Sequence, residues 1–313
     1  MPAIPTMTDA ALPAPARGPG LIGRLMSGKT GPVLVVSLVL IAFWYVMTVY
    51  MNADWAIQQF ERKNVDWSFG DLVTATMEQK RPQLPAPHQI LAELEKSVLD
   101  RKVTSKRSLI YHAGITLSST MLGFLFGTVL GILLAVGIVH QRTMEKSMMP
   151  WVICSQTIPI LAIAPMIIVV LAAIGLRGLV PKAFISMYLC FFPVAIGMVK
   201  GLRSPDLLQL DLMRTYSASR WTVFWSLRWP SAMPYLFTSL KIGIAIALVG
   251  AIVGELPTGA LGGIGSRLLA GSYYGQTIQI WAALLAAAVL AGLLVSAVGL
   301  VEKLVYRRMG VQS

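Results

Sequence analysis

The segment Asp211–Pro230, with the sequence DLMRTYSASRWTVFWSLRWP, stands between two apolar runs at about 180–199 and 234–254. It combines apolar, aromatic and arginine side chains in one short connection. Such a mixture is suited to docking into a groove of a partner protein. An ordinary helical hairpin between two membrane spans is the competing interpretation, and the residues alone leave both open.

Two short helices are expected in and before this segment. The triplet Ser204–Asp206 supplies an N-cap, a proline at the first helical position and an acid near the positive end of the helix dipole. The triplet Ser217–Ser219 offers small residues for a turn, after which Ser219 can cap a second helix at 220–226. Pro230 and Pro234 are expected to close the unit before the next span.

The rest of the chain is apolar enough to cross a membrane several times. Of its 313 residues, 56% are hydrophobic and 13% are charged, against roughly 25% charged residues in soluble domains. Runs near the ~20 residues that span hydrocarbon lie at about 32–50, 113–139, 148–174, 180–199, 234–254 and 278–301. We therefore predict an all-α transmembrane protein with six spans and both termini on the same side.

Basic residues between the runs indicate which side is cytoplasmic. They gather at one face of the predicted bundle, at Arg24, Lys29, Arg142, Lys146, Lys200, Arg203, Arg214, Arg220, Arg228, Lys303, Arg307 and Arg308. The positive-inside rule assigns this face and both termini to the cytoplasm. The net charge of +12 is thereby explained by membrane topology, and no basic domain interleaved with aromatic residues points to nucleic acid.

The predicted domain organisation follows from these runs. It comprises a disordered N-terminus at 1–30, a first span at 31–50, an external segment at 51–112, a five-helix core at 113–303 containing a loop at 204–230, and a tail at 304–313. The external segment holds many bases, but the positive-inside rule is weak for segments near ~60 residues. Within it, Pro87 can begin a helix on the outer membrane surface. One face of this helix would carry Ile90, Leu91, Leu94 and Val98.

One stretch imitates a nucleotide site. Gly23–Thr30, with the sequence GRLMSGKT, satisfies the P-loop pattern. A P-loop needs a buried strand before it and a helix after it in an α/β domain, whereas Gly31-Pro32 leads directly into an apolar run. We interpret this stretch as a chance match. No cluster of histidine, cysteine, serine or carboxylate residues has catalytic or metal-binding spacing, so we predict no enzyme activity, cofactor or metal.

The quoted segment resembles the EAA motif of binding-protein-dependent ABC importer permeases, which reads E-A-A, three residues, G, nine residues, I-x-L-P. Aligned on Pro230, Asp211 takes the place of the glutamate and Ser217 that of the glycine, with no gap. Arg214–Trp221 (RTYSASRW) is similar to A-R-T-x-G-A-S-x-W of the nitrate/sulfonate/taurine-type branch, and Leu84–Pro87 (LPAP) to its L-P-S-P. The resemblance covers about residues 84–308. Serine lacks the freedom of glycine at positive φ.

The resemblance implies a six-span type I importer permease in a bacterial plasma membrane, with a cytoplasmic coupling helix between spans four and five. It also implies cytoplasmic ABC ATPase subunits, an external solute-binding protein and a second permease chain, in a homodimer surrounded by lipid. The residues implied in ATPase coupling are Asp211, Arg214, Ser217, Ala218, Ser219, Arg220 and Pro230. The branch suggests nitrate, sulfonates or taurine as solute, with pyrimidine vitamin precursors or riboflavin-like compounds as alternatives.

Polar side chains inside apolar runs are candidates for a solute pathway, because burying them in hydrocarbon is costly. Ser155, Gln156 and Thr157 precede Pro159 and could line a cavity, or their hydroxyls could satisfy the backbone of a kinked helix. Glu255 ends the fifth run, where it could meet solute or gate the external mouth, or could pair with Arg267. Lys241, inside the same run, is expected to snorkel to the cytoplasmic boundary.

Two glycine patterns complete the sequence evidence. Gly123, Gly127 and Gly131 recur four apart, which predicts close approach of another helix. The glycine-rich stretch 255–277 is interpreted as an external gate or binding-protein contact, or as a solvated loop with Tyr273 and Tyr274 at the membrane boundary. A secondary transporter or channel remains an alternative function, and a membrane-bound enzyme is disfavoured by the absence of a reactive cluster.

Overall fold

The computed structural model describes residues 30–257 and 262–310, and these residues form helices with no β-strand among them, as the predicted all-α class requires. The predicted N-terminal segment 1–30, with its P-loop-like stretch, lies outside the described residues except for Thr30. The helices are α2 (Thr30–Lys63), α3 (Phe69–Met77), α4 (Pro87–Val98), α5 (Leu109–His140), α6 (Arg142–Cys154), α7 (Ile160–Ala173), α8 (Leu179–Leu202), α9 (Leu207–Thr215), α10 (Arg220–Val223), the π-helical η1 (Phe224–Arg228), α11 (Trp229–Glu255), α12 (Ile264–Tyr273) and α13 (Thr277–Arg308).

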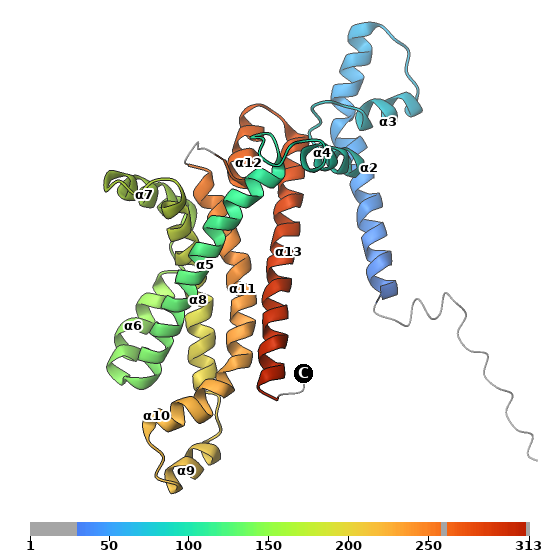
Figure 1. Cartoon of the computed structure of the whole chain (residues 1–313). Coiled ribbons are helices and arrows are strands. Elements are labelled where there is room, and N and C mark those ends of the chain that lie inside the picture. The colour runs from blue at the N-terminus through green and yellow to red at the C-terminus, as the bar shows by residue number, and fades with distance from the viewer. Residues whose placement is uncertain (1–29, 258–261, 311–313) are drawn as a thin grey trace, which may run out of the picture.

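Five helices are long and apolar enough to cross a membrane. They are α2, α5, α8, the continuous helix Arg220–Glu255 that contains α11, and α13, with lengths of 24 to 36 residues. At ~1.5 Å per residue, each exceeds the ~30 Å hydrocarbon core. The N-terminal end of α2 and the C-terminal end of α13 point to the same side of the molecule as α9 and α10 (Figure 1).

The third predicted span, 148–174, is not one continuous helix, which corrects the prediction. It is divided into α6 and α7, with Ser155–Pro159 between them. Pro159 has no N–H group and cannot bond the carbonyl of Ser155 four residues earlier, as a continuing helix would require. The hydroxyl of Tyr188 on α8 donates to this carbonyl instead. Neither half alone has the length of a span.

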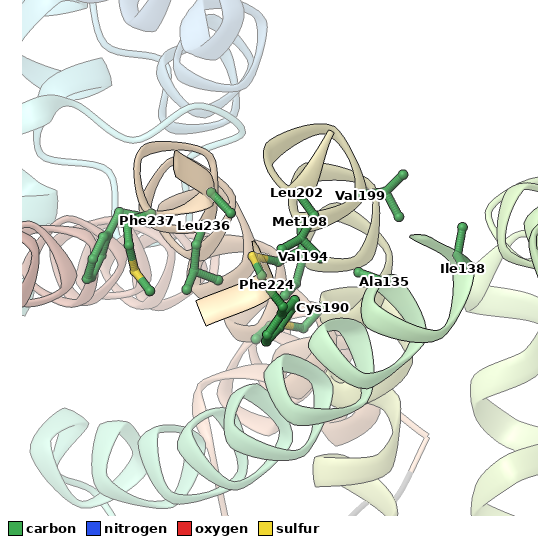
Figure 2. Close-up of a cluster of buried hydrophobic side chains, with 13 residues drawn as sticks. Ala135, Ile138, Cys190, Val194, Met198, Val199, Leu202, Phe224, Leu236 and Phe237 are labelled. Atoms are coloured by element: carbon green, nitrogen blue, oxygen red, sulfur yellow. The ribbon is translucent and has the colours of Figure 1, made fainter. Parts of the chain in front are cut away.

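The hydrophobic core lies where α5, α8 and α11 pack together. Side chains from these three helices and from Phe224 of η1 gather in one cluster (Figure 2). Its buried members are Ala135, Ile138, Cys190, Val194, Met198, Val199, Leu202, Phe224, Ala232, Met233, Leu236, Phe237 and Ala247. The cluster extends toward the loop that carries α9 and α10, because Phe224 belongs to the continuation of that loop.

The glycines spaced four apart on α5 face α8, which confirms the predicted close approach. A Cβ atom added at Gly123 would lie 2.3 Å from Cβ of Ser186, and one added at Gly131 would lie 2.8 Å from the carbonyl oxygen of Phe191. Both distances are shorter than any van der Waals contact. Helix α8 therefore packs directly on the backbone of α5, in the manner of small-residue interfaces between membrane helices.

Helix α2 continues beyond its apolar run to Lys63, so the first part of the predicted external segment is an extension of the first helix. The LPAP stretch docks on this extension through the buried Asn52. The side-chain oxygen of Asn52 accepts the N–H of Gln83 at 2.7 Å, and its NH₂ group donates to the carbonyl of Leu84 at 2.8 Å. Together with Trp44, whose indole N–H donates to the carbonyl of Pro85 at 3.1 Å, Asn52 holds the connection between α2 and α4.

The predicted helix beginning at Pro87 is confirmed as α4. Ile90 is buried, and Leu94 and Val98 pack with it against α13. Leu91 is 58% exposed and does not share this packed face. The apolar face of α4 thus packs against α13 at the end of the bundle opposite α9 and α10.

Candidate functional site

The loop between α8 and α11 folds into two short helices, α9 and α10, that project from one end of the bundle (Figure 1). The N-cap of α9 is Asp206, not Ser204 as predicted, and its backbone N–H donates to Oε1 of Gln209 at 3.3 Å. Ser204 instead donates its hydroxyl to the carbonyl of Gly201, in the last turn of α8, at 2.8 Å. Pro205 therefore precedes the N-cap instead of occupying the first helical position, as the sequence had predicted.

The turn between the helices places Ser217 at a φ of +51°, in the left-handed region. The N–H of Ser217 bonds the carbonyl of Arg214 at 2.8 Å, and the N–H of Ala218 bonds that of Met213 at 3.0 Å. This pair of bonds is the Schellman ending of a helix, in which the left-handed position usually carries glycine. The structure therefore gives a physical reason for the glycine of the EAA pattern, whose place Ser217 takes.

The second predicted cap is confirmed, because Oγ of Ser219 accepts the N–H of Thr222 at 3.1 Å. The predicted closure of the unit at Pro230 and Pro234 is wrong, since the helix runs from Arg220 to Glu255 without a break. Pro230 thus lies inside a continuous helix, although at the start of α11, and its missing N–H interrupts the regular hydrogen-bond ladder there. The π-helical turn η1 directly before it adjusts the backbone register at this point.

Large apolar side chains cover the outside of α9 and α10. Those more than half exposed are Leu207, Leu208, Leu212, Tyr216 and Trp221. Beside them, the exposed Asp211 and Arg214 form an ion pair of 2.9 Å within α9. We call this set, with the exposed Arg220, the α9–α10 surface. Contiguous exposed apolar side chains rimmed by polar ones are typical of protein interaction sites.

An aromatic chain links the α9–α10 surface to the core. The exposed Trp221 stacks on the buried Phe224 with ring centroids 6.1 Å apart, and Phe224 contacts the edge of the His140 ring on α5 at 5.2 Å. Arg228 donates from Nη1 to the carbonyl of Leu202 at 3.1 Å, which ties the start of α11 to the end of α8. Through these contacts, a displacement of α10 can be transmitted to α5, α8 and α11.

The opposite end of the bundle holds a buried carboxylate, Glu255, which no solvent reaches. The hydroxyl of Thr116 on α5 donates to its Oε1 at 2.9 Å, and the N–H of Gly265 donates to its Oε2 at 2.8 Å. The ammonium of Lys182 on α8 lies 3.9 Å from Oε1. The ion pair that the described residues form at Glu255 is with Lys182, so the considered pairing with Arg267 is not found.

The backbone of the segment 262–265 is hydrogen-bonded to the same group of side chains. Lys182 donates to the carbonyl of Gly262 at 3.1 Å, and Thr116 accepts the N–H of Ile264 at 2.9 Å. Nδ1 of His112 accepts the N–H of Gly263 at 2.9 Å, so this imidazole is neutral at Nδ1 and its Nε2 donates to the carbonyl of Lys106. We call His112, Thr116, Lys182, Glu255 and 262–265 the outer polar node.

The remaining predicted pathway residues lie apart from the node, between α6 and α7. The hydroxyl of Ser155 donates to the carbonyl of Val152 at 2.7 Å and that of Thr157 to the carbonyl of Cys154 at 2.8 Å. These bonds favour the interpretation that the hydroxyls satisfy a helix end. Gln156 is exposed on the surface of the described chain.

Lys241 does not merely snorkel. Its ammonium forms an ion pair with Glu302 of α13, whose side chain is only 17% exposed. Both residues lie inside helices of membrane-spanning length, where an isolated charge is costly and a paired one is tolerated. The pair joins α11 to α13 toward the end of the bundle from which α9 and α10 project.

Three members of the outer polar node were missed in the sequence. Lys182 lies inside the predicted span 180–199, where a charged residue is itself a signal of function. Thr116 carries no sequence signal that distinguishes it from other hydroxyl residues in apolar helices. His112 has no other histidine near it in the sequence, so it did not suggest a site. Their partners are more than 60 residues away along the chain, so only the packing of α5, α8 and α11 brings them together.

Known proteins resemble this chain over more than half of its length. Residues 127–311 match the family described as binding-protein-dependent transport system inner membrane component. A probable ABC transporter permease protein of Haemophilus influenzae is 30% identical over 64% of this chain and 79% of its own length. The riboflavin transport system permease protein RibX of Chloroflexus aurantiacus is 31% identical over 63% of this chain and 71% of its own.

A putative aliphatic sulfonates transport permease protein of Bacillus subtilis is 26% identical over 70% of this chain and 76% of its own length. Similar permeases are also named for formylaminopyrimidine, nitrate and taurine. The relatives are thus named for several different small solutes.

Proposed function

The chain belongs to the family of binding-protein-dependent transport system inner membrane components, and from this premise we propose that it moves a small solute inward through the membrane. Its relatives are permease subunits of ABC importers, which are transport components and not enzymes. The solute is delivered by an external binding protein, and ATP is hydrolysed on separate cytoplasmic subunits.

The α9–α10 surface is the docking site for the ATPase. The observation that carries this proposal is a projecting pair of capped helices whose large apolar side chains are more than half exposed. Trp221 and Phe224 then pass the movement of the ATPase to the core. The proposed coupling residues, from Asp211 to Pro230, act through the shape of this surface and not by chemistry on the nucleotide.

One experiment tests the proposal. The chain is co-purified with candidate ATPase subunits, and ATP hydrolysis and solute uptake are measured in proteoliposomes with loaded binding protein. We expect uptake to require both ATP and the ATPase subunit. Replacing Ser217 by Arg is expected to abolish co-purification while membrane insertion persists. Uptake without any ATPase subunit would instead favour a secondary transporter or channel.

The solute is proposed to be a nitrogen heterocycle related to pyrimidine vitamin precursors or riboflavin. Relatives named for riboflavin and formylaminopyrimidine are each 31% identical to this chain over the matched residues, whereas those named for sulfonates, nitrate and taurine are 26%, 27% and 24% identical. Binding of each class to the cognate external binding protein, measured by calorimetry, tests the choice. Nitrate or taurine binding alone would reverse it.

The functional unit is proposed to hold two copies of the chain in a bacterial plasma membrane, with both termini in the cytoplasm. The end of the bundle that carries the α9–α10 surface also carries the C-terminal end of α13 and the basic residues Lys303, Arg307 and Arg308 (Figure 1). Labelling of introduced terminal cysteines by an impermeant reagent tests the topology, and mass measurement of the purified complex tests the copy number.

The outer polar node is proposed to gate the external mouth. It joins α5, α8, α11 and the segment 262–265 through buried bonds, so these elements separate only if the bonds break. Cysteines at positions 116 and 264 allow the node to be locked by oxidation. We expect oxidation to stop uptake and a reductant to restore it, whereas each single cysteine is insensitive. Undiminished uptake by the locked chain would exclude a gate here.

A further inference from the structure

A cationic hollow opens on the outer end of the bundle, between α4, α12 and the start of α13. Its volume is about 370 Å³. Four cations line it, namely Lys96 of α4, Arg101 and Arg107 of the connection to α5, and Arg267 of α12, whereas Glu93 is the one acid among its lining residues. Within the described residues, the ion pairs that form lie elsewhere and involve none of these four cations. Four cations against one acid leave the lining with a net positive charge.

Arg267 is the most constrained of the four cations. Burial lowers the pKa of its guanidinium, Glu93 opposes this effect and Arg101 adds to it by like-charge repulsion. Guanidinium groups gathered in this way favour a planar or tetrahedral anion, because each can offer two parallel N–H donors. The arrangement is that of a site for a phosphate or carboxylate group.

Arg267 also lines a second, larger hollow of about 680 Å³ beside the first. Apolar and aromatic walls come from Tyr111 of α5, Leu269 and Tyr273 of α12, and Tyr274 directly after α12. The polar residues beside Arg267 in this lining are Lys106, His112 and Ser266. Tyr273 and Tyr274 are 79% and 69% exposed. Exposed tyrosines at the outer ends of membrane helices are typical of the boundary between headgroups and hydrocarbon. Arg267 thus lines both hollows and lies between the cationic one and the aromatic one.

We propose that the two hollows together hold an anionic phospholipid of the outer leaflet. Its phosphate binds Arg101, Arg107 and Arg267, and the glycerol and upper acyl carbons lie along Tyr111 and Tyr273. A free anion would bind in the cationic hollow alone and would leave the adjoining apolar hollow unoccupied. Basic pockets between membrane helices on the cytoplasmic side bind acidic headgroups, and the same charge pairing applies to an acidic headgroup at this end. The lipid would hold α4, α5, α12 and α13 together at the outer face.

The test uses the full chain in mild detergent and native mass spectrometry with added phosphatidylglycerol or phosphatidylcholine. We expect the wild-type chain to retain phosphatidylglycerol at least tenfold more than phosphatidylcholine. The double variant R101Q/R267Q is expected to lose this preference. The matched control is R142Q/K146Q, which removes the same charge from a hollow at the cytoplasmic end and is expected to change retention less than twofold. Equal retention by both double variants would overturn the proposal.

Further experiments distinguish a lipid from a free anion, and a loss of the binding site from a loss of the fold. Short-chain phosphatidylglycerol is expected to compete for the site at least tenfold better than glycerol phosphate, and equal competition would mean a free-anion site. Arg267→Lys keeps the charge and is expected to retain binding within about threefold of wild type. If R101Q/R267Q keeps its lipid but loses stimulation by the binding protein, the hollow is a protein contact and the proposal fails.

Discussion

The backbone angle at Ser217 explains why the motif carries glycine at this position. A non-glycine residue in the left-handed region costs roughly 1–2 kcal/mol, and this position has a φ of +51°. Ser217→Gly relieves the strain but adds entropy to the unfolded chain, so we expect a net gain of about 0.5 kcal/mol. Ser217→Val should distort the end of α9. ATPase co-purification should be preserved or stronger for the glycine variant and weaker for the valine variant.

Asn64 provides the control for this prediction, because it has a φ of +47° at the opposite end of the molecule. The same changes at Asn64 should alter thermal stability in the same directions without changing ATPase binding. If valine at Ser217 left the ATPase affinity unchanged, the shape of the turn would be irrelevant to docking.

The buried pair Lys182–Glu255 makes a second prediction at the level of the residue. Removing one partner of a buried ion pair costs about 3–5 kcal/mol, because it leaves the other charge uncompensated. Lys182→Met should therefore lower the Tm of the purified protein strongly. Adding Glu255→Gln should recover much of the loss, since the amide oxygen still accepts from Gly265. The measurement is the Tm of Lys182→Met and of the double variant Lys182→Met/Glu255→Gln. Equal destabilisation of these two proteins would contradict a charge pair.

At the scale of the element, sequence patterns predict helices well and their ends poorly. The glycine spacing of α5 and the start of α4 at Pro87 were both predicted, because each depends on local chemistry. Hydropathy alone could not reveal the break at Pro159, since both sides of the proline are apolar. It also could not show that the helix passes through Pro230, where the π-turn compensates for the missing donor.

The break between α6 and α7 makes a prediction for Tyr188. Its hydroxyl takes the place of the N–H that Pro159 lacks. Tyr188→Phe leaves the carbonyl of Ser155 without this donor, which should cost about 1–3 kcal/mol if the carbonyl stays away from water. Hydrogen exchange of α6 and α7 should increase. The control is Tyr274→Phe, whose exposed side chain should be replaceable without effect. Unchanged exchange for Tyr188→Phe would mean that water satisfies the carbonyl.

The ion pair between Lys241 and Glu302 connects α11 to α13 inside the membrane-spanning region. Either Lys241→Met or Glu302→Leu should destabilise the chain, by about 2–3 kcal/mol. The double variant should be close to wild type, because both charges are removed together. Tm values of the four proteins form a double-mutant cycle. A double variant as unstable as the sum of the single ones would show that the residues act independently.

At the scale of the whole molecule, the two ends of the bundle differ in how far sequence could predict them. The α9–α10 surface is contiguous in the chain, so motif spacing could point to the segment from Asp211 onward, whereas the exposed Leu207 and Leu208 lie before the motif. The outer polar node joins residues from α5, α8, α11 and 262–265, and the sequence identified only Glu255 and the glycine-rich stretch that contains 262–265. A site assembled from distant helices depends on packing angles that periodicity does not encode.

The core joins these two ends, which leads to the prediction that binding and coupling can be separated. Leu208→Asp with Leu212→Asp should abolish ATPase binding, because both side chains are exposed on α9. Phe224→Ala should instead preserve ATPase binding, since Phe224 is buried behind the surface, yet reduce uptake per ATP hydrolysed several-fold. Such a truncation also costs about 3–5 kcal/mol, so uptake is compared below the Tm of the variant.

The control for this pair is Leu91→Asp, which places the same charge on an exposed leucine at the outer end of the molecule and should leave ATPase binding unchanged. Hydrolysis and uptake are measured together in proteoliposomes, so that their ratio is independent of the amount of active protein. If Phe224→Ala lowered hydrolysis and uptake equally, the aromatic chain from Trp221 would serve stability alone. Movement of the ATPase could then reach the outer polar node along the continuous helix Arg220–Glu255 and through the Arg228–Leu202 contact.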